Sequence, residues 1–288
     1  MPSQILLKLE IEEPYLKILF VGDVFGSAGR RIVREHLPHL RETHALDLIV
    51  INGENAAGGF GITPNLAEEL FELGADVITT GNHVWDKREL LDYLKSAPPE
   101  SDARPRRVLR PANLQAGLPG YGLFEGKIAR GPDAGTPYAV INIMGRVMMN
   151  GTNDPFNEAN RLLTQVAQQS KARIILVDFH AEATSEKVAM GWHLDGRVTA
   201  VLGTHTHIPT ADERVLPGGT AYQTDVGMSG PYDSVIGVET ELVMARFLTG
   251  MSGKFEAATG NPKLCAALIT CDVTTGKAQR IQRIMLGE

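Results

Sequence analysis

The sequence predicts an α/β fold. Short apolar runs rich in Val and Ile alternate with longer amphipathic stretches, which is the pattern of folds that combine strands with connecting helices. Hydrophobic residues make up 43% of the 288 residues and charged residues 22%, which is enough apolar mass to build a core. The length fits one large domain or two small ones.

Six apolar runs are predicted to be buried strands, because β-branched residues suit strands that are covered on both faces. The runs are Leu16–Val21, Leu46–Ile51, Asp76–Thr79, Tyr138–Ile143, Arg173–Val177 and Val198–Leu202. Parallel strands in a sheet of this kind bind ligands outside their carboxyl ends, so the residues that follow each run are the first candidates for a site.

Three stretches between these runs are predicted to be helices. Ala28–Leu40 carries its apolar residues on one side. Thr63–Pro64 has the signature of an N-cap followed by proline at the first helical position, and it introduces a helix over Asn65–Leu73. Asp154–Pro155 opens another helix in the same way.

The remaining segments are less regular. Ala97–Gly120 is rich in Pro, Arg and Gly, which indicates a long connection or a small insertion. From Ala211 onward the pattern predicts further strands, with turns at Pro217–Gly219 and Thr274–Gly276. The cluster from Arg104 to Arg110 is open to two interpretations, a solvated face or a patch that steers phosphate.

The charge balance limits the partners. There are 28 basic and 34 acidic residues, a net charge of −6, whereas proteins that bind duplex nucleic acid non-specifically have basic surfaces. No apolar stretch approaches the roughly 20 residues of a membrane span, and the first residues lack the basic start of a signal peptide. We therefore expect a cytoplasmic protein with no membrane partner. The two cysteines, Cys265 and Cys271, are expected to be reduced thiols in the core.

Polar tips follow five of the six runs. Each offers an oxygen or imidazole donor at the end of a strand, and neighbouring strands lie only about 4.8 Å apart, so the donors can converge on one metal-sized volume. His205 and His207 are two residues apart and would point to the same side of an extended segment. The tips contain Asp23, Glu54, Asn55, Asn82, His83, Asp178, His180, His205 and His207.

The donor types indicate a catalytic metal centre. Carboxylates, an amide and imidazoles without a thiolate favour Mn, Fe or Zn over a structural zinc site. There are more donors than one tetrahedral ion needs, so two ions about 3.5–4 Å apart are expected. Such a centre stays net positive and would bind a phosphate on an otherwise acidic protein.

A dinucleotide site is the weaker alternative at the first tip. Gly22, Gly26 and Gly29 follow a strand, but their spacing is one residue too long for the G-x-G-x-x-G fingerprint. Asp23 would also direct a carboxylate to the place of the pyrophosphate.

Together, the tips resemble those of the calcineurin-type metallophosphoesterases. The strings GDVFGSAGR, INGENAAGGFGIT, TTGNHVWD, VDFHAEATSEK, GTHTHIPTAD and AYQTDVGMSGP are similar to the bacterial YmdB-like branch of that superfamily. The resemblance runs from about Lys17 to near the C-terminus. It implies a four-layer α/β/β/α sandwich with mixed sheets, formed by residues 16–288 as a single domain. Residues 1–15 would be an extension, either an extra edge strand or a disordered segment.

The resemblance also implies roles for individual residues. The first metal would be held by Asp23, Glu54, Asn55 and His207. The second would be held by the bridging Glu54 and by Asn82, His180 and His205. His83 would lie beside the metals as the general acid, because imidazole side chains titrate near neutral pH. Asp225 stands at a position near the site in this family, and the sequence assigns it no role.

The chain departs from the wider superfamily at two positions. The usual first motif is Asp-x-His, but here Asp23 is followed by Val24 and Phe25, so an imidazole is lost and Asn55 is placed to substitute. The bridging acid is Glu54 rather than Asp. We expect Fe or Mn as the metal, with Zn as the alternative.

The implied activity is hydrolysis of a phosphodiester by in-line attack of a hydroxide held between the two metals. The best candidate substrates are 2′,3′- and 3′,5′-cyclic nucleotides, and a phosphomonoester is the near alternative. A regulatory scaffold with little turnover is a second hypothesis, motivated by Phe25 in place of histidine. Assembly into a homo-oligomer is left open.

Overall fold

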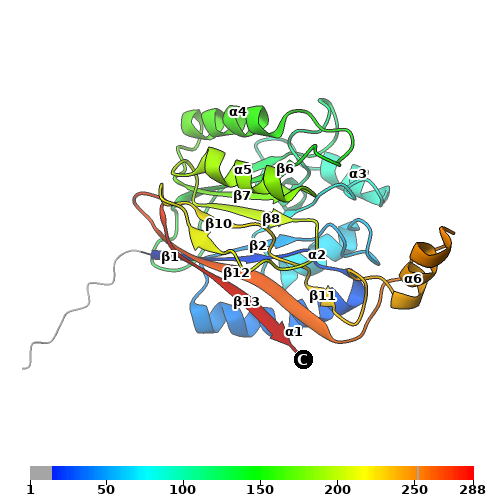
Figure 1. Ribbon diagram of the computed structural model, residues 1–288. Helices are drawn as coiled ribbons and strands as arrows, with labels where there is room; N and C mark the ends of the chain where they lie inside the picture. Colours follow the sequence, from blue (N-terminus) through cyan, green and yellow to red (C-terminus); the bar gives the residue numbers. More distant parts are fainter. Residues whose placement is uncertain (1–14, 252) are drawn as a thin grey trace, which may run out of the picture.

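Two mixed β-sheets pack against each other in the computed structural model, which describes residues 15–251 and 253–288 (Figure 1). The predicted α/β class is confirmed. The two interpretations of residues 1–15 lie outside the described residues, except that Tyr15 begins the first strand.

The first sheet has the strand order β11-β12-β1-β2-β3-β4, with β13 paired to β12. β1 to β4 run parallel, and β12 is antiparallel to β1. The strands are β1 (Tyr15–Val21), β2 (Leu48–Asn52), β3 (Val77–Thr79), β4 (Val108–Leu109), β11 (Gly230–Pro231), β12 (Pro262–Asp272) and β13 (Ala278–Gly287). Val21 pairs with Ile51, and Asn52 pairs with Thr79, so β1, β2 and β3 end at one edge.

The second sheet has the order β5-β6-β7-β8-β10-β9. Its strands are β5 (Leu123–Lys127), β6 (Pro137–Met144), β7 (Ile174–His180), β8 (Ala200–Thr204), β9 (Arg214–Val215) and β10 (Ala221–Gln223). β6, β7, β8 and β10 are parallel, and β5 and β9 pair antiparallel at the two edges. Met144, His180 and Thr204 are in register, so three strands of this sheet also end level.

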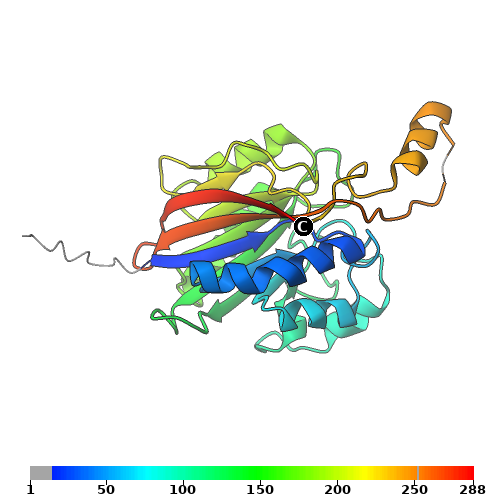
Figure 2. The ribbon, with the colours of Figure 1, turned by 90° about the horizontal axis from the view of Figure 1, so that it is seen from below.

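Helices cover the outer faces of the sheets. Buried side chains of α1 and α2 pack on the first sheet, and those of α4 and α5 pack on the second. The helices are α1 (Gly26–His44), α2 (Pro64–Glu72), α3 (Glu89–Lys95), α4 (Pro155–Gln168), α5 (Thr184–Leu194) and α6 (Thr240–Thr249), with a 3₁₀ turn, η1, at Arg104–Arg107. Figure 2 shows α1 lying along the first sheet and α6 standing away from both sheets.

The strand β1 shows why the apolar runs are continuous. Ile18 and Phe20 belong to the core between the two sheets, whereas Leu19 and Val21 belong to the core under α1. Successive side chains of a strand point to opposite faces, so a strand between two cores must be apolar at every position.

The two predicted helix starts are confirmed. The side chain of Thr63 accepts a hydrogen bond from the backbone N–H of Leu66, and Asp154 accepts from Phe156 and Asn157. These bonds satisfy N–H groups that the first helical turn leaves without a partner.

The strands β4 and β5 and the helices α3, α5 and α6 were not predicted. In α5, Glu186 and Lys187 are buried, so polar residues interrupt the apolar face. In α6, Phe247 and Leu248 are exposed, so this helix has no simple division into an apolar and a polar side. For these reasons neither α5 nor α6 is detected as a helix from the periodicity of its apolar residues.

Arg106 and Arg110 of the arginine cluster have structural roles that the sequence did not predict, whereas Arg104 is exposed, as the solvated interpretation expects. The guanidinium of Arg106 lies 4.0 Å from the ring centroid of Tyr121 and donates a 2.7 Å hydrogen bond to the carbonyl of Leu123. Arg110 donates to the carbonyls of Pro111 and Pro119. These bonds hold together the long connection predicted between residues 97 and 120.

Cys265 and Cys271 are free and buried, which confirms the prediction of reduced core thiols. Within residues 15–251 and 253–288, no helix combines the length and apolar composition that a membrane span requires.

Candidate metal centre

The polar tips of both sheets meet at one place. Asp23 follows β1, Glu54 and Asn55 follow β2, and Asn82 and His83 follow β3, all in the first sheet. From the second sheet, His180 is the last residue of β7, and His205 and His207 follow β8. The structure therefore brings together donors that are up to 184 residues apart in the chain.

Glu54 and His180 form the buried centre of this group. Glu54 Oε1 lies 3.1 Å from His180 Nε2, and that same nitrogen lies 2.9 Å from Asn82 Oδ1 and 3.1 Å from His205 Nδ1. The ligand atoms of Glu54, His180 and His205 all lie within 4.8 Å of one another. His180 Nε2 carries at most one hydrogen, so it can donate a hydrogen bond to only one of these three neighbours. The arrangement therefore suits a bound cation better than a set of hydrogen bonds.

A buried carboxylate orients His180 from behind. Asp178 accepts a 2.7 Å hydrogen bond from the hydroxyl of Thr204, and that hydroxyl in turn accepts from His180 Nδ1 at 2.9 Å. A proton is thereby held on Nδ1, so a cation would meet His180 at Nε2. Without a cation, Glu54 raises the pKa of His180 to about 9, against the effect of burial, and Nε2 also carries a proton. Support of a ligand histidine by a second acceptor is typical of metal sites.

Asp178 also orients the tip of β2. Its other oxygen accepts a hydrogen bond from Asn52 Nδ2 at 2.9 Å, and Asn52 Oδ1 accepts from the backbone N–H of Glu54 at 3.1 Å. Burial raises the pKa of Asp178 to about 6, against the charge of His180 and the hydrogen bonds that lower it. Asp178 therefore connects candidate ligands from the two sheets.

The other two imidazoles are oriented in the same way. His207 Nδ1 donates to the carbonyl of Ile236 at 2.8 Å, and His205 Nε2 lies 3.1 Å from Glu182 Oε2. A carbonyl and a carboxylate can only accept, so the remaining nitrogen of each ring is free to act as a ligand.

Two buried oxygens at the site lack a hydrogen-bond partner among the described residues, Asp23 Oδ1 and Asn55 Oδ1. The other carboxylate oxygen of Asp23 accepts from the backbone N–H of His205 at 3.1 Å, and Asn55 Nδ2 lies 3.0 Å from His207 Nε2. A buried oxygen left unpaired costs about 1–3 kcal/mol. Divalent cations would satisfy both oxygens, so the residues fit the metal that the donor types indicate.

The electrostatics of the group are strongly perturbed. Burial raises the pKa of Asp23 well above its usual value, and the charges of Glu54 and other carboxylates add to this effect. Burial also acts on Glu54, but His180 and other imidazoles outweigh it and hold the pKa of Glu54 at about 2. The pKa of His205 falls to about 3 through burial and the charge of His180. Bound cations would allow both carboxylates to be ionised and His205 to be neutral.

The backbone of the β3 tip approaches the group closely at Gly81. A Cβ added there would lie 2.2 Å from Glu54 Oε2 and 2.3 Å from His180 Nε2. A side chain at this position would therefore displace the donors themselves.

His205 and His207 reach the site in a different way from the prediction. The expected extended segment is wrong, because the φ angles of His205 and His207 are 97° and 66°. Left-handed backbone at non-glycine residues costs on the order of 1–3 kcal/mol each and persists only where surrounding contacts hold it.

A buried ion pair holds this turn. Asp225 Oδ2 accepts from the backbone N–H and the hydroxyl of Thr206, at 3.1 and 2.8 Å. Lys187 Nζ donates to the same oxygen at 2.6 Å and to the carbonyl of Thr204 at 2.7 Å. The position that the sequence left without a role is thus a clamp on the turn between two donors, and its partner Lys187 was missed.

Replacing Lys187 by Met is expected to lower the free energy of unfolding by about 3–5 kcal/mol, because it leaves the buried Asp225 carboxylate unpaired. Denaturant unfolding measures the loss. Lys95→Met is the control, since Lys95 is 61% exposed and its ion pair with Asp92 is loose. The assignment is wrong if the two variants unfold at the same denaturant concentration.

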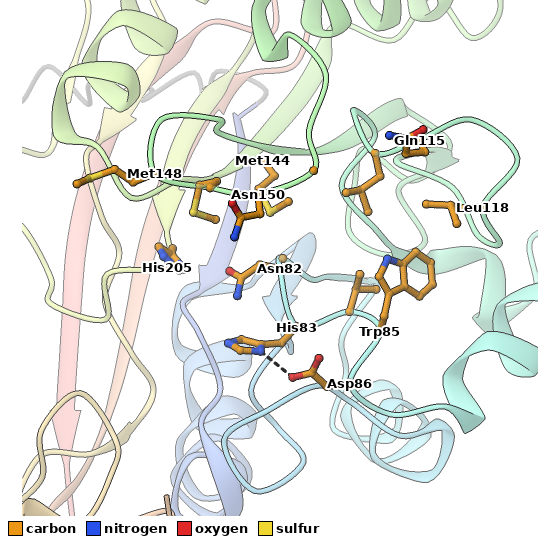
Figure 3. Close-up of a pocket in the computed structure, with 15 residues that line it drawn as sticks. Asn82, His83, Trp85, Asp86, Gln115, Leu118, Met144, Met148, Asn150 and His205 are labelled. Atoms are coloured by element: carbon orange, nitrogen blue, oxygen red, sulfur yellow. Dashed lines mark hydrogen bonds and ion pairs between the residues drawn. The ribbon is translucent and has the colours of Figure 1, made fainter. Parts of the chain in front are cut away.

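His83 lies beside the buried group and carries its own acceptor. His83 Nδ1 is 2.8 Å from Asp86 Oδ2, as Figure 3 shows, and the ring contacts Phe60 edge to face at 5.1 Å. The backbone N–H of His83 also points to Glu54 Oε2 at 3.4 Å. Asp86 was missed in the sequence, although it stands three residues after His83.

A hollow of about 320 Å³ opens over the donors. Its polar lining includes Glu54, Asn55, His205 and His207, and its apolar lining includes Phe25. The ring of Phe25 contacts that of His207 edge to face, with 5.6 Å between the ring centroids.

Comparison with known proteins gives one family. The family model described as "YmdB-like protein" matches residues 19–284. A 2′,3′-cyclic-nucleotide 2′-phosphodiesterase of Bacillus subtilis (strain 168) is 44% identical over 273 residues, which cover 95% of this chain and 98% of that protein.

Two solved structures agree with it. The crystal structure of a hypothetical protein from Thermus thermophilus matches with a TM-score of 0.84 and 41% identity, over 95% of this chain and all of that one (100%). A novel phosphatase from Mycoplasma pneumoniae matches with a TM-score of 0.85 and 33% identity, over 96% and 95% of the two chains. The resemblance seen in the sequence motifs is confirmed.

Proposed function

The chain belongs to the YmdB-like protein family, and from its site we propose that it is a phosphodiesterase that hydrolyses cyclic nucleotides with two divalent metal ions. The observation that carries the proposal is the set of buried acceptors that face one another, in which Asp23 Oδ1 and Asn55 Oδ1 have no hydrogen-bond partner in the described part of the chain. The name of the Bacillus subtilis relative supports the substrate class.

Contacts between the donors support a division into two ligand sets. Asn55 and His207 lie 3.0 Å apart and would hold the first metal together with Asp23. His180 contacts both Asn82 and His205, and these three residues would hold the second metal. Glu54 would bridge the two, since Oε1 is 3.4 Å from Asn55 Nδ2 and 3.1 Å from His180 Nε2.

Divalent ions bound there would withdraw electron density from the phosphoryl group and supply a nucleophile at neutral pH. His83 would hold a proton at Nε2 and give it to the leaving oxygen, because Nδ1 is bonded to Asp86. Asp86 would fix the ring orientation and stabilise the charged imidazole before it donates.

Two further features belong to the same proposal. The helices packed on the outer faces of both sheets support a four-layer α/β/β/α sandwich that residues 16–288 form as a single domain. Oxygen and nitrogen donors without a thiolate support Fe or Mn as the metal, with Zn as the alternative. We favour a phosphodiesterase over a phosphomonoesterase or a scaffold with little turnover, because of the name of the relative at 44% identity.

The purified protein loaded with Mn²⁺ or Fe²⁺ tests the proposal. We expect hydrolysis of adenosine 2′,3′- or 3′,5′-cyclic phosphate that is faster than that of p-nitrophenyl phosphate and is abolished by EDTA. Metal analysis is run on the same samples and should give two ions per chain. Faster cleavage of the monoester would favour a phosphatase, and two bound ions without any turnover would favour a scaffold.

A further inference from the structure

A second and larger hollow, of about 730 Å³, adjoins the metal centre and shares His83 and His205 with the first (Figure 3). Its volume is within the range of small-molecule sites. Apart from the shared residues and the tip of β3, its walls are largely apolar. They include Trp85, Leu114, Leu118, Met144, Met148 and Met149.

The lining of this hollow suits an uncharged, flat group. Asp86 is its only acidic residue, and neither Lys nor Arg is among its lining residues, so it offers no cation to a second phosphate. An indole and thioether side chains are polarisable surfaces that pack well on an aromatic ring. The side chains of Gln115 and Asn150 add amide groups.

Figure 3 shows how these groups face one another. Trp85, Leu118 and Gln115 lie on one side of the hollow, and Met148 and His205 lie on the other. Among the residues drawn, only His83 and Asp86 are joined by a hydrogen bond, so the two amides are not bonded to other walls of the hollow. Amides with free donors and acceptors at the rim of an apolar slot can bond the edge of a ring whose faces the slot covers.

The loop that forms the wall after β6 is anchored at both ends. Glu186 accepts hydrogen bonds from the backbone N–H groups of Arg146 and Val147, at 3.1–3.2 Å. At the other end, Asn153 donates from its backbone to the carbonyl of Asn113 at 2.8 Å and accepts from the Asn113 side chain. These hydrogen bonds hold both ends of the loop and so fix where its tip lies.

Met148 stands at this tip in an unusual conformation. Its φ angle is 62°, and the residue is 85% exposed. A large apolar side chain held in water by left-handed backbone is unfavourable for the isolated fold, and such outliers gather at ligand sites. A ligand in the hollow would cover it.

The two hollows divide the substrate between them. The smaller is lined by Glu54, Asn55 and His207, where the phosphoryl group would meet the metals. His83 lines both, so the leaving oxygen that it would protonate stands at the boundary. The part of the substrate beyond the ribose then extends into the larger hollow.

We propose that the larger hollow holds the nucleobase of a mononucleotide, with Trp85 as the stacking face and Gln115 and Asn150 as the groups that bond the base edge. The proposal rests on the phosphodiesterase function proposed above. It assigns residues to recognition of the base, and it excludes substrates that need a second phosphate in this hollow.

The test compares adenosine 2′,3′-cyclic phosphate with methyl β-D-ribofuranoside 2′,3′-cyclic phosphate, which has the same reactive ring but no base. In Trp85→Ala, kcat/KM for the nucleotide should fall by about 5- to 150-fold, mainly through KM, because stacking of a base on an aromatic side chain contributes about 1–3 kcal/mol. The value for the compound without a base should be unchanged. Trp85→Phe should recover most of the loss.

Trp192→Ala is the matched control. Trp192 is the other tryptophan of the chain, is 52% exposed and lies outside the lining of both hollows. Met148→Ser is a second variant, and it changes an exposed residue that does not contribute to the core. It should weaken binding of the nucleotide but not of the compound without a base.

Fluorescence gives a readout that does not need turnover. In Trp192→Phe, Trp85 is the only indole, and adenosine 3′-phosphate should quench its emission whereas ribose 3-phosphate should not. Equal kcat/KM for the two cyclic phosphates, or an equal loss for both in Trp85→Ala, overturns the base site and leaves the proposed function intact. If the protein cleaves neither, the proposed function fails, and the quenching alone then supports or overturns the base site.

Discussion

Glu54→Gln is expected to abolish metal binding and hydrolysis together. The substitution keeps the shape of the side chain but removes a charge that lies between the two ligand sets, 3.1 Å from His180 Nε2 and 3.4 Å from Asn55 Nδ2. The two ligand sets would then contain one carboxylate, the buried Asp23, for two divalent ions. Because the metals supply several kcal/mol of transition-state stabilisation, kcat/KM should fall about 10³-fold or more.

Metal content and turnover measured on the same sample test this expectation. Glu158→Gln makes the same change on α4, where Glu158 pairs with Arg161, and it should alter neither quantity. A Glu54→Gln protein that keeps two ions and full activity would rule out the bridging role.

His83→Ala is expected to keep both metals and to slow hydrolysis of a cyclic nucleotide by about 10²–10⁴-fold, the usual contribution of a general acid. His83 contacts the buried donors only through its backbone N–H, and its ring is held by Asp86 and Phe60. Removal of the ring therefore takes away a proton donor and leaves the ligand sets in place.

Leaving-group dependence separates this role from others. Nitrophenolate leaves without protonation, so His83→Ala should slow bis-p-nitrophenyl phosphate much less than adenosine 2′,3′-cyclic phosphate. Asp86→Asn should retain the metals and lose less activity than His83→Ala, because it disturbs the orientation of the ring and keeps the donor. Loss of metal from His83→Ala would instead make His83 a ligand.

The strands and the donors at their ends were predictable from the sequence for a local reason. A strand buried on both faces must be apolar at each position, as in β1, and this leaves a clear boundary where Asp23 follows. N-caps such as Thr63 and Asp154 are equally local, since their bonds reach only three residues along the chain.

Hydrophobic periodicity failed to predict a helix where buried polar side chains support the site. The helix α5 was missed because Glu186 and Lys187 interrupt its buried face, one to hold the loop after β6 and the other to clamp the turn after β8. Elements that support a site break the simplest rules of patterning, because their buried residues are chosen for partners on other elements.

The kinds of donor, their order and the family were therefore in the linear chain, since each is a matter of residue type and neighbouring residues. The three-dimensional fold added everything that depends on residues far apart. It placed Asp178 behind His180, gave His205 and His207 left-handed backbone and formed a hollow around Trp85. Such contacts arise only when two sheets close on each other, because no local pattern records which distant partner a polar side chain will meet.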